Sequence, residues 1–459
     1  MIRKLKMITT GACIALLLAA CDNAGHSEPF EWPENTNGQS PFYGETLTIA
    51  SAEPGRNWAG AEIHGLARVV SAYMWANPGV TIQMINFDIS ADGVSERFDI
   101  EMMAGTAPVL IDSVLVDHLN PITAQLLANW YPIMAAAPNF NEDDWFMNVF
   151  DTFATNGQLR IFPTHFNYRF IQANSFLPEF VQALEAKDNI TVAQMQQMHR
   201  ELATTDMPLD FMMNFDVFLA IRNYLDYFLD IDSGMVNFDN QQFIDLITYA
   251  KNITAPDRRF ESYIAWVGYT RTLEHEWALE YLFMNTRAPF QFHYYLDLDR
   301  HRSFAVPTPL VNDRGELLAE LTEGFALNAG ATQIQKALAW DFVYFTANYL
   351  DRSQFGLHQM QPTNRNLLYA TVERWLPDIR AGYVRQGWLQ QEDEQADIES
   401  VMARMTTLAE MPMSSVGVPN VVLNAITEIV GQFHDGLITA EQAAQDLQNR
   451  ITLILMEMS

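Results

Sequence analysis

The hydrophobic pattern between residues 46 and 85 constrains the fold of this chain more than any other feature. A β-like run at 46–50 is followed by apolar residues at helical spacing from Ile63 to Met74, and then by an alternating run at 80–85. An Asn-Pro-Gly turn at 77–79 separates the helix from the second strand. Strand, helix and strand in this order form a βαβ unit, in which a helix covers two parallel strands. The sequence therefore predicts an α/β fold from residue 45 onward.

The pattern continues along the chain. A helix through Phe98 to Met103 ends at Gly105, and the apolar run at 108–112 predicts a strand that is buried on both faces. Beyond Pro163 the pattern becomes more helical, with strand-like pieces at 209–213 and 304–306. Single apolar stripes predict helices at 243–250, 334–349 and 440–454, and Thr439 with Gln442 makes a capping box for the last one. We therefore expect a second α/β part that is richer in helices.

The N-terminal residues have the layout of an export signal. Basic residues at positions 3, 4 and 6 precede an apolar stretch that ends in Leu18-Ala19-Ala20-Cys21. This ending is similar to a bacterial lipobox, in which Cys21 is lipidated and becomes the mature N-terminus; an ordinary signal peptide with an incidental cysteine is the alternative. Polar, Pro- and Gly-punctuated sequence follows. We predict a lipoprotein signal peptide at 1–20 and a flexible tether from the lipidated Cys21 at 21–44.

Composition excludes several classes of function. The other cysteine, Cys13, lies inside the predicted signal, so the mature chain has neither a disulfide framework nor a cysteine metal site. The 56 acidic and 27 basic residues give a formal net charge of −29, so nucleic acid is not an expected partner. His275-Glu276 lacks the second histidine of a metalloprotease motif, and there is no spaced acidic loop for calcium. We expect no metal and no cofactor.

Six short segments form an ordered set along the chain. They are residues 76–80, 102–112, 157–163, 238–243, 324–328 and 337–342. Together, and behind the predicted lipobox, they resemble family 1 extracellular solute-binding proteins, the lipoprotein relatives of maltose-binding protein. The resemblance covers nearly everything after residue 45. Val109 stands where the family usually has Asp, and Arg160 where it usually has an aromatic residue, which affects ligand contacts and not the fold.

The resemblance implies a two-lobed periplasmic-binding-protein-like fold of type II, with an interlobe ligand cleft and a hinge. Expected boundaries are 45–162 with 325–350 for lobe 1, and 163–324 with 351–459 for lobe 2. The chain would cross between lobes near Pro163, near Gly324 and after Leu350. The implied function is that of a monomeric solute-binding lipoprotein of an ABC importer. It would capture a carbohydrate by lobe closure on the outer face of the cytoplasmic membrane and deliver it to the permease.

The expected ligand site follows from the rule that ligands bind at the carboxyl ends of strands in open α/β sheets. A sugar needs flat aromatic faces and planar amide or carboxylate groups. Trp58 and Trp266 are the strongest candidates for a stacking platform, although any single aromatic can instead be a core residue, and Asp112 can instead be a helix N-cap. The predicted ligand-binding residues are Glu53, Arg56, Asn57, Trp58, Asp112, Ser113, His165, Asn167, Tyr168, Asn214, Asp216, Trp266 and Tyr269.

Three functional hypotheses remain open from the sequence. The leading one is a binding protein that performs no chemistry on its ligand. A secreted carbohydrate-active hydrolase is the second, because carboxylates are plentiful enough to flank a glycosidic bond. A binding protein for peptides or another small solute is the third, because it would share the same fold.

Overall fold

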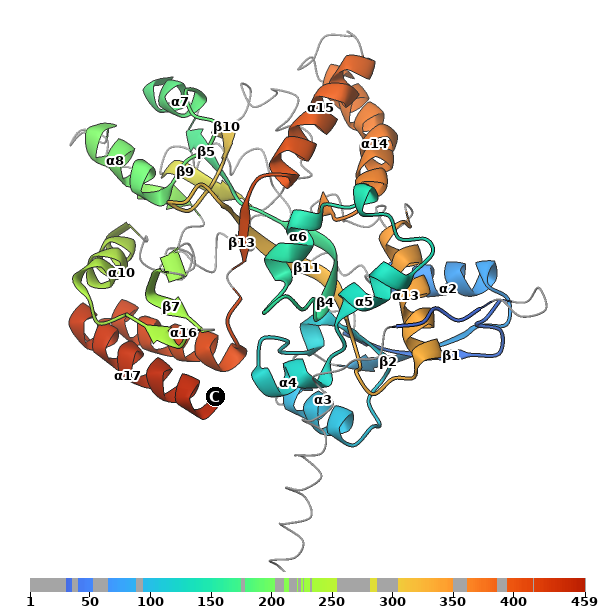
Figure 1. Cartoon of the computed structure of the whole chain (residues 1–459). Helices are drawn as coiled ribbons and strands as arrows, with labels where there is room; N and C mark the ends of the chain where they lie inside the picture. The colour runs from blue at the N-terminus through green and yellow to red at the C-terminus, as the bar shows by residue number, and fades with distance from the viewer. Residues whose placement is uncertain are drawn as a thin grey trace, which may run out of the picture.

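The computed structural model describes residues 30–34, 40–52, 65–87, 94–174, 178–202, 210–213, 221, 224–225, 227–231, 233–253, 281–286, 304–349, 361–385, 394–415 and 417–458. Within these residues the strands form two larger sheets and one hairpin (Figure 1). The first sheet has seven strands in the order β12-β4-β11-β3-β1-β2, with β13 pairing to β11. The second has four strands in the order β10-β5-β9-β6, and β7 pairs with β8.

The first sheet begins with the predicted βαβ unit. β1 (Thr46–Ala52), α2 (Gly65–Ala76) and β2 (Thr81–Phe87) follow one another, and β1 pairs with β2 in parallel. α3 (Val94–Met103) and β3 (Leu110–Asp112) come next, and β3 lies parallel to β1 on its other side. The α/β prediction for this region is therefore confirmed.

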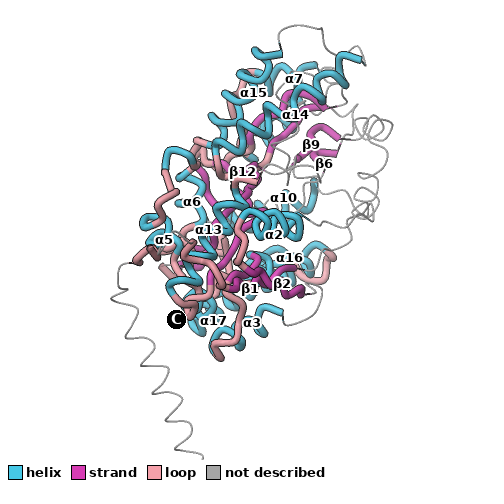
Figure 2. The backbone as a smooth tube through the Cα atoms, turned by 90° about the vertical axis from the view of Figure 1, so that its right-hand side faces the viewer, coloured by secondary structure: helices cyan, strands magenta, loops and turns pink. Residues whose placement is uncertain are grey.

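The remaining elements around the first sheet are short or distant in sequence. They are η2 (Ser113–Leu115), α4 (Pro121–Leu126), α5 (Trp130–Ala136), η3 (Glu142–Asp144), α6 (Met147–Phe153), β4 (Ile161–Asn167), β11 (Leu317–Leu327), α13 (Gln333–Ala347), β12 (Gln361–Pro362), α14 (Arg365–Arg385), α15 (Glu394–Ala409) and β13 (Met413–Ser415). α14 and α15 lie together at the end of the molecule beyond β12 (Figure 2).

Alternate residues of the central strands face two different apolar layers, as the period of two in a β-strand requires. In β4, Phe162 packs into a large core with α2, α5, α6 and α13, whereas its neighbour Ile161 packs toward α3 and η2. In β11, Phe325 packs into the same large core as Phe162, and its neighbour Ala326 packs with Ile161 on the other face. Both faces of this sheet are thus covered, which explains the nearly continuous apolar runs of its strands.

The second lobe is built on the four-stranded sheet. Its elements are β5 (Phe170–Asn174), α7 (Pro178–Glu185), α8 (Val192–Leu202), β6 (Asp210–Met213), β7 (Leu229–Asp230), β8 (Met235–Val236), α10 (Gln241–Ile253), β9 (Tyr281–Thr286), β10 (Phe304–Pro309), α16 (Asn420–His434) and α17 (Ala440–Met458). A separate apolar core joins α7, α8, α10, α16 and α17. The predicted capping box of α17 is present, since Thr439 N donates to Gln442 Oε1 at 2.9 Å and Gln442 N donates to Thr439 Oγ1 at 3.2 Å.

The chain crosses between the sheets beyond the β4–β11 ladder. Pro163 and Gly324 face each other inside the first sheet, because the β4–β11 ladder continues to the pair Asn167 and Glu320. The first crossing follows at residues 168–169, and the return passes through Leu310, whose N–H donates to Arg169 O at 2.9 Å. α14 and α15, which the predicted boundaries put in lobe 2, bury Leu368 and Val401 in the core of the first sheet. Lobe 1 is therefore larger than expected.

The predicted tether is folded in part. Phe30 and Trp32 pack against the first core with ring centroids 6.3 Å apart, and Trp32 lies 6.2 Å from the ring of the buried Phe42. Gly44 N donates to Gly79 O at 2.8 Å, which ties the following turn to the sheet. Residues 30–34 and 40–44 of the predicted tether thus pack on the first lobe through their aromatic side chains. Cys21 and the rest of residues 1–29 lie outside the described residues.

Within the described part of the chain, none of the helices combines the length and the apolar character that a bilayer crossing requires.

We expect Trp32→Ala to lower the free energy of unfolding by about 1–2 kcal/mol, because half-buried aromatic surface returns to water. Urea unfolding followed by fluorescence measures this change. Trp75→Ala is the matched control, because the Trp75 side chain is 85% exposed on α2 and its removal should cost less than about 0.5 kcal/mol. Equal unfolding midpoints for the two variants would show that the N-terminal segment does not stabilise the fold.

Candidate functional site

A cavity of about 730 Å³ lies at the junction of the two lobes. The first lobe contributes residues 118–119, 152–156 and 318–321 to its wall, and the second contributes residues 225, 229–231, 235 and 423. Arg314 and residues 414, 415, 417 and 418 line it from the segments that connect the lobes. This volume falls in the range of pockets that enclose small ligands.

The cavity lies at the carboxyl end of β3, where the fold predicts a ligand. β3 ends at Asp112, which is opposite Phe325, so the N-terminal half of β11 extends beyond it. The loop after η2 turns there and brings His118 and Leu119 to the cavity wall. β11 is longer than β3, and the register of the two strands leaves the extra length of β11 beyond Asp112. The cavity lies beside this extra length.

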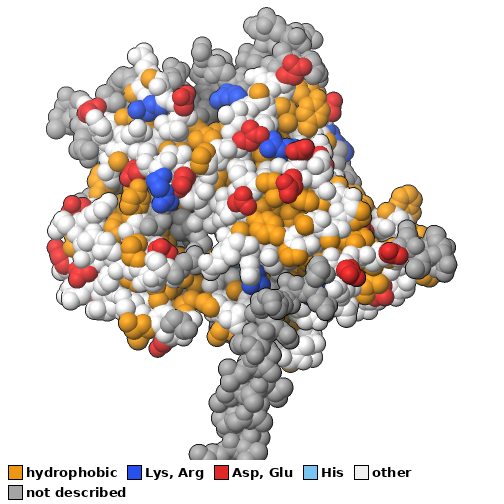
Figure 3. All heavy atoms as spheres, viewed as in Figure 1, with side chains coloured by type: hydrophobic (Ala, Val, Ile, Leu, Met, Phe, Trp, Pro, Cys, Tyr) orange, Lys and Arg blue, Asp and Glu red, His pale blue; other side chains and the backbone are white. Residues whose placement is uncertain are grey.

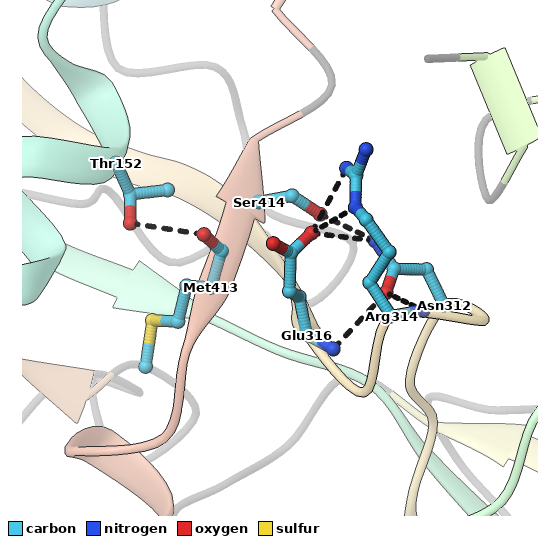
Figure 4. A network of polar contacts seen from close by, with 6 residues as sticks. All are labelled: Thr152, Asn312, Arg314, Glu316, Met413 and Ser414. Atoms are coloured by element: carbon cyan, nitrogen blue, oxygen red, sulfur yellow. Dashed lines mark hydrogen bonds and ion pairs between the residues drawn. The ribbon is translucent and has the colours of Figure 1, made fainter. Parts of the chain in front are cut away.

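A tight turn before β11 fixes the position of Arg314 on the wall (Figure 4). Asn312 Oδ1 accepts from the N–H groups of Arg314 and Glu316, both at 3.0 Å. Asn312 Nδ2 donates to Glu316 Oε2 at 2.8 Å and to Ser414 Oγ at 3.3 Å. Arg314 Nε donates to the same Glu316 oxygen at 2.9 Å. The guanidinium is therefore paired, and the turn is joined to β13.

The other edge of β13 is held by α6. Thr152 Oγ1 donates to Met413 O at 3.5 Å, and Ser415 Oγ donates to Thr152 O at 2.9 Å (Figure 4 includes the first of these). Asn148 Nδ2 donates to the carbonyl oxygens of Ala409 and Met411 at 2.8 and 3.1 Å. β13 is thus fixed to the first lobe up to Ser415.

Charges on the described wall are mostly balanced. The buried Arg169 donates from Nε and Nη2 to Glu320 Oε1, at 3.0 and 2.5 Å. Burial lowers the pKa of His118 to about 4, so this side chain is neutral at neutral pH.

Acidic, basic and apolar side chains are interspersed over the face seen in Figure 3, without a large patch of one charge. Hydroxyl and amide groups between apolar side chains suit a neutral polar ligand.

The predicted contacts on β4 and after it are buried in the sheet. Tyr168 is fully buried and donates to Gln361 Oε1 at 3.0 Å. His165 is 4% exposed, and its Nδ1 lies 3.3 Å from Glu323 Oε2. Asn167 is buried as well, and none of these three residues lines the cavity. The side chains of β4 are buried against the layers that cover the sheet, and residues 318–321 of the neighbouring β11 line the cavity instead.

Asp112 acts as a cap. Its Oδ1 accepts from Val114 N at 3.3 Å at the start of η2, which confirms the N-cap interpretation of this residue. Ser113 is the first residue of η2 and is partly buried. Neither side chain lines the cavity.

The other predicted residues of the site lie outside the described residues and remain predictions. They are Glu53, Arg56, Asn57, Trp58, Asn214, Asp216, Trp266 and Tyr269.

Sequence reasoning missed most of the described wall. His118 and Leu119 belong to the same loop as Ser113, so extending the strand-end rule to the end of that loop would have found them. Arg314 stands in an Asn-Asp-Arg-Gly turn at 312–315, which is a recognisable turn before a strand. Thr152 had no signal, because its position depends on contacts far away in the sequence.

Comparisons with known proteins give structural matches only. No protein-family model matches the chain, and no curated protein matches its sequence. The sugar-binding protein MalE from Xanthomonas citri matches with a TM-score of 0.59 and 14% identity, over 90% of this chain and 98% of that one.

Two further solved structures are similar. A family 1 extracellular solute-binding protein from Alicyclobacillus acidocaldarius has a TM-score of 0.55 and 13% identity, over 90% of this chain and 99% of that one. Maltose-bound MalE3 from T. maritima has a TM-score of 0.52 and 14% identity, over 89% and 99%. The chain therefore has the two-lobed α/β fold of the MalE-like, family 1 extracellular solute-binding proteins.

Proposed function

We propose that this protein is a solute-binding protein that captures a carbohydrate between its lobes and delivers it to the permease of an ABC importer. The observation that carries the proposal is the cavity of about 730 Å³, whose wall comes from both lobes and from the connecting segments. A ligand in this position contacts both lobes at once, so it stabilises their closed arrangement. The structural neighbours include a sugar-binding protein and a maltose-bound protein of the same fold, which favours a sugar as the ligand.

The described cavity suits binding better than hydrolysis. A glycosidase needs one carboxyl group that donates a proton and a second carboxylate across the glycosidic bond. Glu320 on the wall accepts two hydrogen bonds from Arg169, an arrangement typical of a structural ion pair and not of a general acid. We therefore propose that the protein is not an enzyme and that it releases its ligand unchanged.

Calorimetric titration with a panel of maltose, maltotriose and short peptides tests the proposed function. We expect saturable one-to-one binding of at least one oligosaccharide, a smaller radius of gyration by X-ray scattering at saturation, and no release of reducing ends. Release of reducing ends with turnover would establish the hydrolase instead. Binding of peptides alone would establish the third hypothesis.

We expect Trp58 or Trp266 to provide the stacking platform for a sugar ring, as predicted from the sequence. Changing a platform residue to Ala should weaken binding by about 1–3 kcal/mol, because one aromatic face is lost, and should leave the melting temperature without ligand nearly unchanged. Trp130→Ala is the contrasting control, because Trp130 is fully buried and its removal should cost about 3–5 kcal/mol of stability. If both candidate variants bind with wild-type affinity, or both melt early, neither residue is the platform.

We further propose that the protein is anchored on the outer face of the cytoplasmic membrane through a lipid on Cys21. Cys21→Ala should move the protein from the membrane fraction to the soluble fraction, because the acyl chains provide the attachment. Cys13→Ala is the matched control, and it should leave the protein with the membranes. Membrane retention of the Cys21→Ala protein would contradict the anchor without affecting the proposed ligand.

A further inference from the structure

A hydrogen bond joins the two lobes at the edge of the cavity. Asp117 lies in the loop that follows η2 on the first lobe, and its Oδ2 accepts from Asn420 N at 2.7 Å. Asn420 is the first residue of α16, a helix that buries Val422 and Ala425 in the core of the second lobe. Figure 1 shows the start of α16, where β13 leads into it, approaching the first lobe beside α4. This bond therefore links the loop after η2 to the start of α16, across the boundary between the lobes.

The start of α16 needs an acceptor from outside the helix. Its N-cap residue is Pro419, which makes no side-chain hydrogen bond to the helix. The first N–H groups of a helix have no partner within it, and the helix dipole favours a negative charge near them. Asp117 provides both an acceptor and a charge from the opposite lobe. The carboxylate also accepts from the N–H groups of Leu119 and Asn120, so its own loop holds it in position.

An apolar contact adjoins this bond. A Cβ atom on Gly417 would lie 2.9 Å from Leu119 Cδ1, so the segment before α16 touches the loop of Asp117 closely. Leu119 and Gly417 both line the cavity. The two lobes thus meet through a polar and an apolar contact at neighbouring positions, on the segment that follows the fixed strand β13.

We propose that Asp117 and the N-terminus of α16 form a latch that favours the closed arrangement of the lobes before any ligand is bound. Both partners belong to the chain, so the latch acts without a ligand and goes beyond the proposed function. A ligand that requires the closed arrangement binds with an apparent Kd equal to the intrinsic Kd divided by the closed fraction. The latch increases that fraction and thereby strengthens binding of whatever the cavity holds.

Asn420→Pro tests the latch from the second lobe. Proline removes the N–H donor and is favoured at the first position of a helix, and Pro419 already has the φ of −54° and ψ of 146° that a residue before proline adopts. Spin labels at Ile100→Cys on α3 and Leu453→Cys on α17 report the distance between the lobes, since these side chains are 63% and 57% exposed. The labels are placed in the full chain with Cys13→Ser and Cys21→Ser, and no ligand is added.

We expect the ratio of closed to open protein to fall about fivefold in Asn420→Pro, as for the loss of one helix cap. Asn420→Ala retains the N–H group and should give the wild-type distance distribution. Asp117→Ala, on the other lobe, should open the protein as much as Asn420→Pro does, and combining the two should add nothing. The latch is refuted if Asn420→Pro and Asn420→Ala give the same distribution, or if Asp117→Ala leaves the closed population unchanged. These outcomes do not depend on which ligand, if any, the titrations identify.

Discussion

The antiparallel pairing of β4 with β11 is the contact on which the two-lobed arrangement depends. The ladder runs from Ile161 and Ala326 to Asn167 and Glu320, and the backbone contact of Leu310 with Arg169 extends it toward the second sheet. The buried ion pair of Arg169 and Glu320 lies at the end of the ladder. Removing one partner of such a pair leaves a buried charge without compensation, which is far more costly than the pair is stabilising. The two chain crossings therefore remain side by side, and the cavity forms next to them.

This constraint determines where the lobes can move. β4 and β11 lead side by side to the two crossings at Arg169 and Leu310, and β13 is held to α6 by Thr152 and to the turn before β11 by Asn312. The third connection follows Ser415 and leads through Gly417 and Val418 into α16. The start of α16, which follows this segment, is hydrogen-bonded to the loop of Asp117 on the first lobe. In the proposed latch, closure of the cavity and formation of the interlobe hydrogen bond are one movement.

Local patterns predicted much of this fold, and long-range pairing explains what they missed. The βαβ unit and the capping box of α17 depend on residues close in sequence, and both are present. Where the ladder of β4 and β11 ends could not be read from local patterns, because it depends on residues more than a hundred positions apart. The tether was predicted flexible because Phe30 and Trp32 are isolated among polar residues, and only the fold provides the surface that buries them. Of the site, the strand-end rule found the right loop after β3, but it stopped at Ser113 while the wall begins at His118.

The character of the cavity wall and the interlobe contact together bear on how a neutral ligand closes this protein. A ligand shifts the equilibrium between open and closed lobes only by the difference in its affinity for the two states. A neutral ligand carries no charge and so cannot draw on ion pairs for this difference, and Arg314 and Glu320 on the wall are already paired within the chain. The contact of Asp117 with α16 supplies part of the closing free energy from the protein itself. Hydrogen bonds from hydroxyl and amide groups then need to contribute only the remainder, which allows a neutral polar solute to hold the lobes closed and still be released when they open.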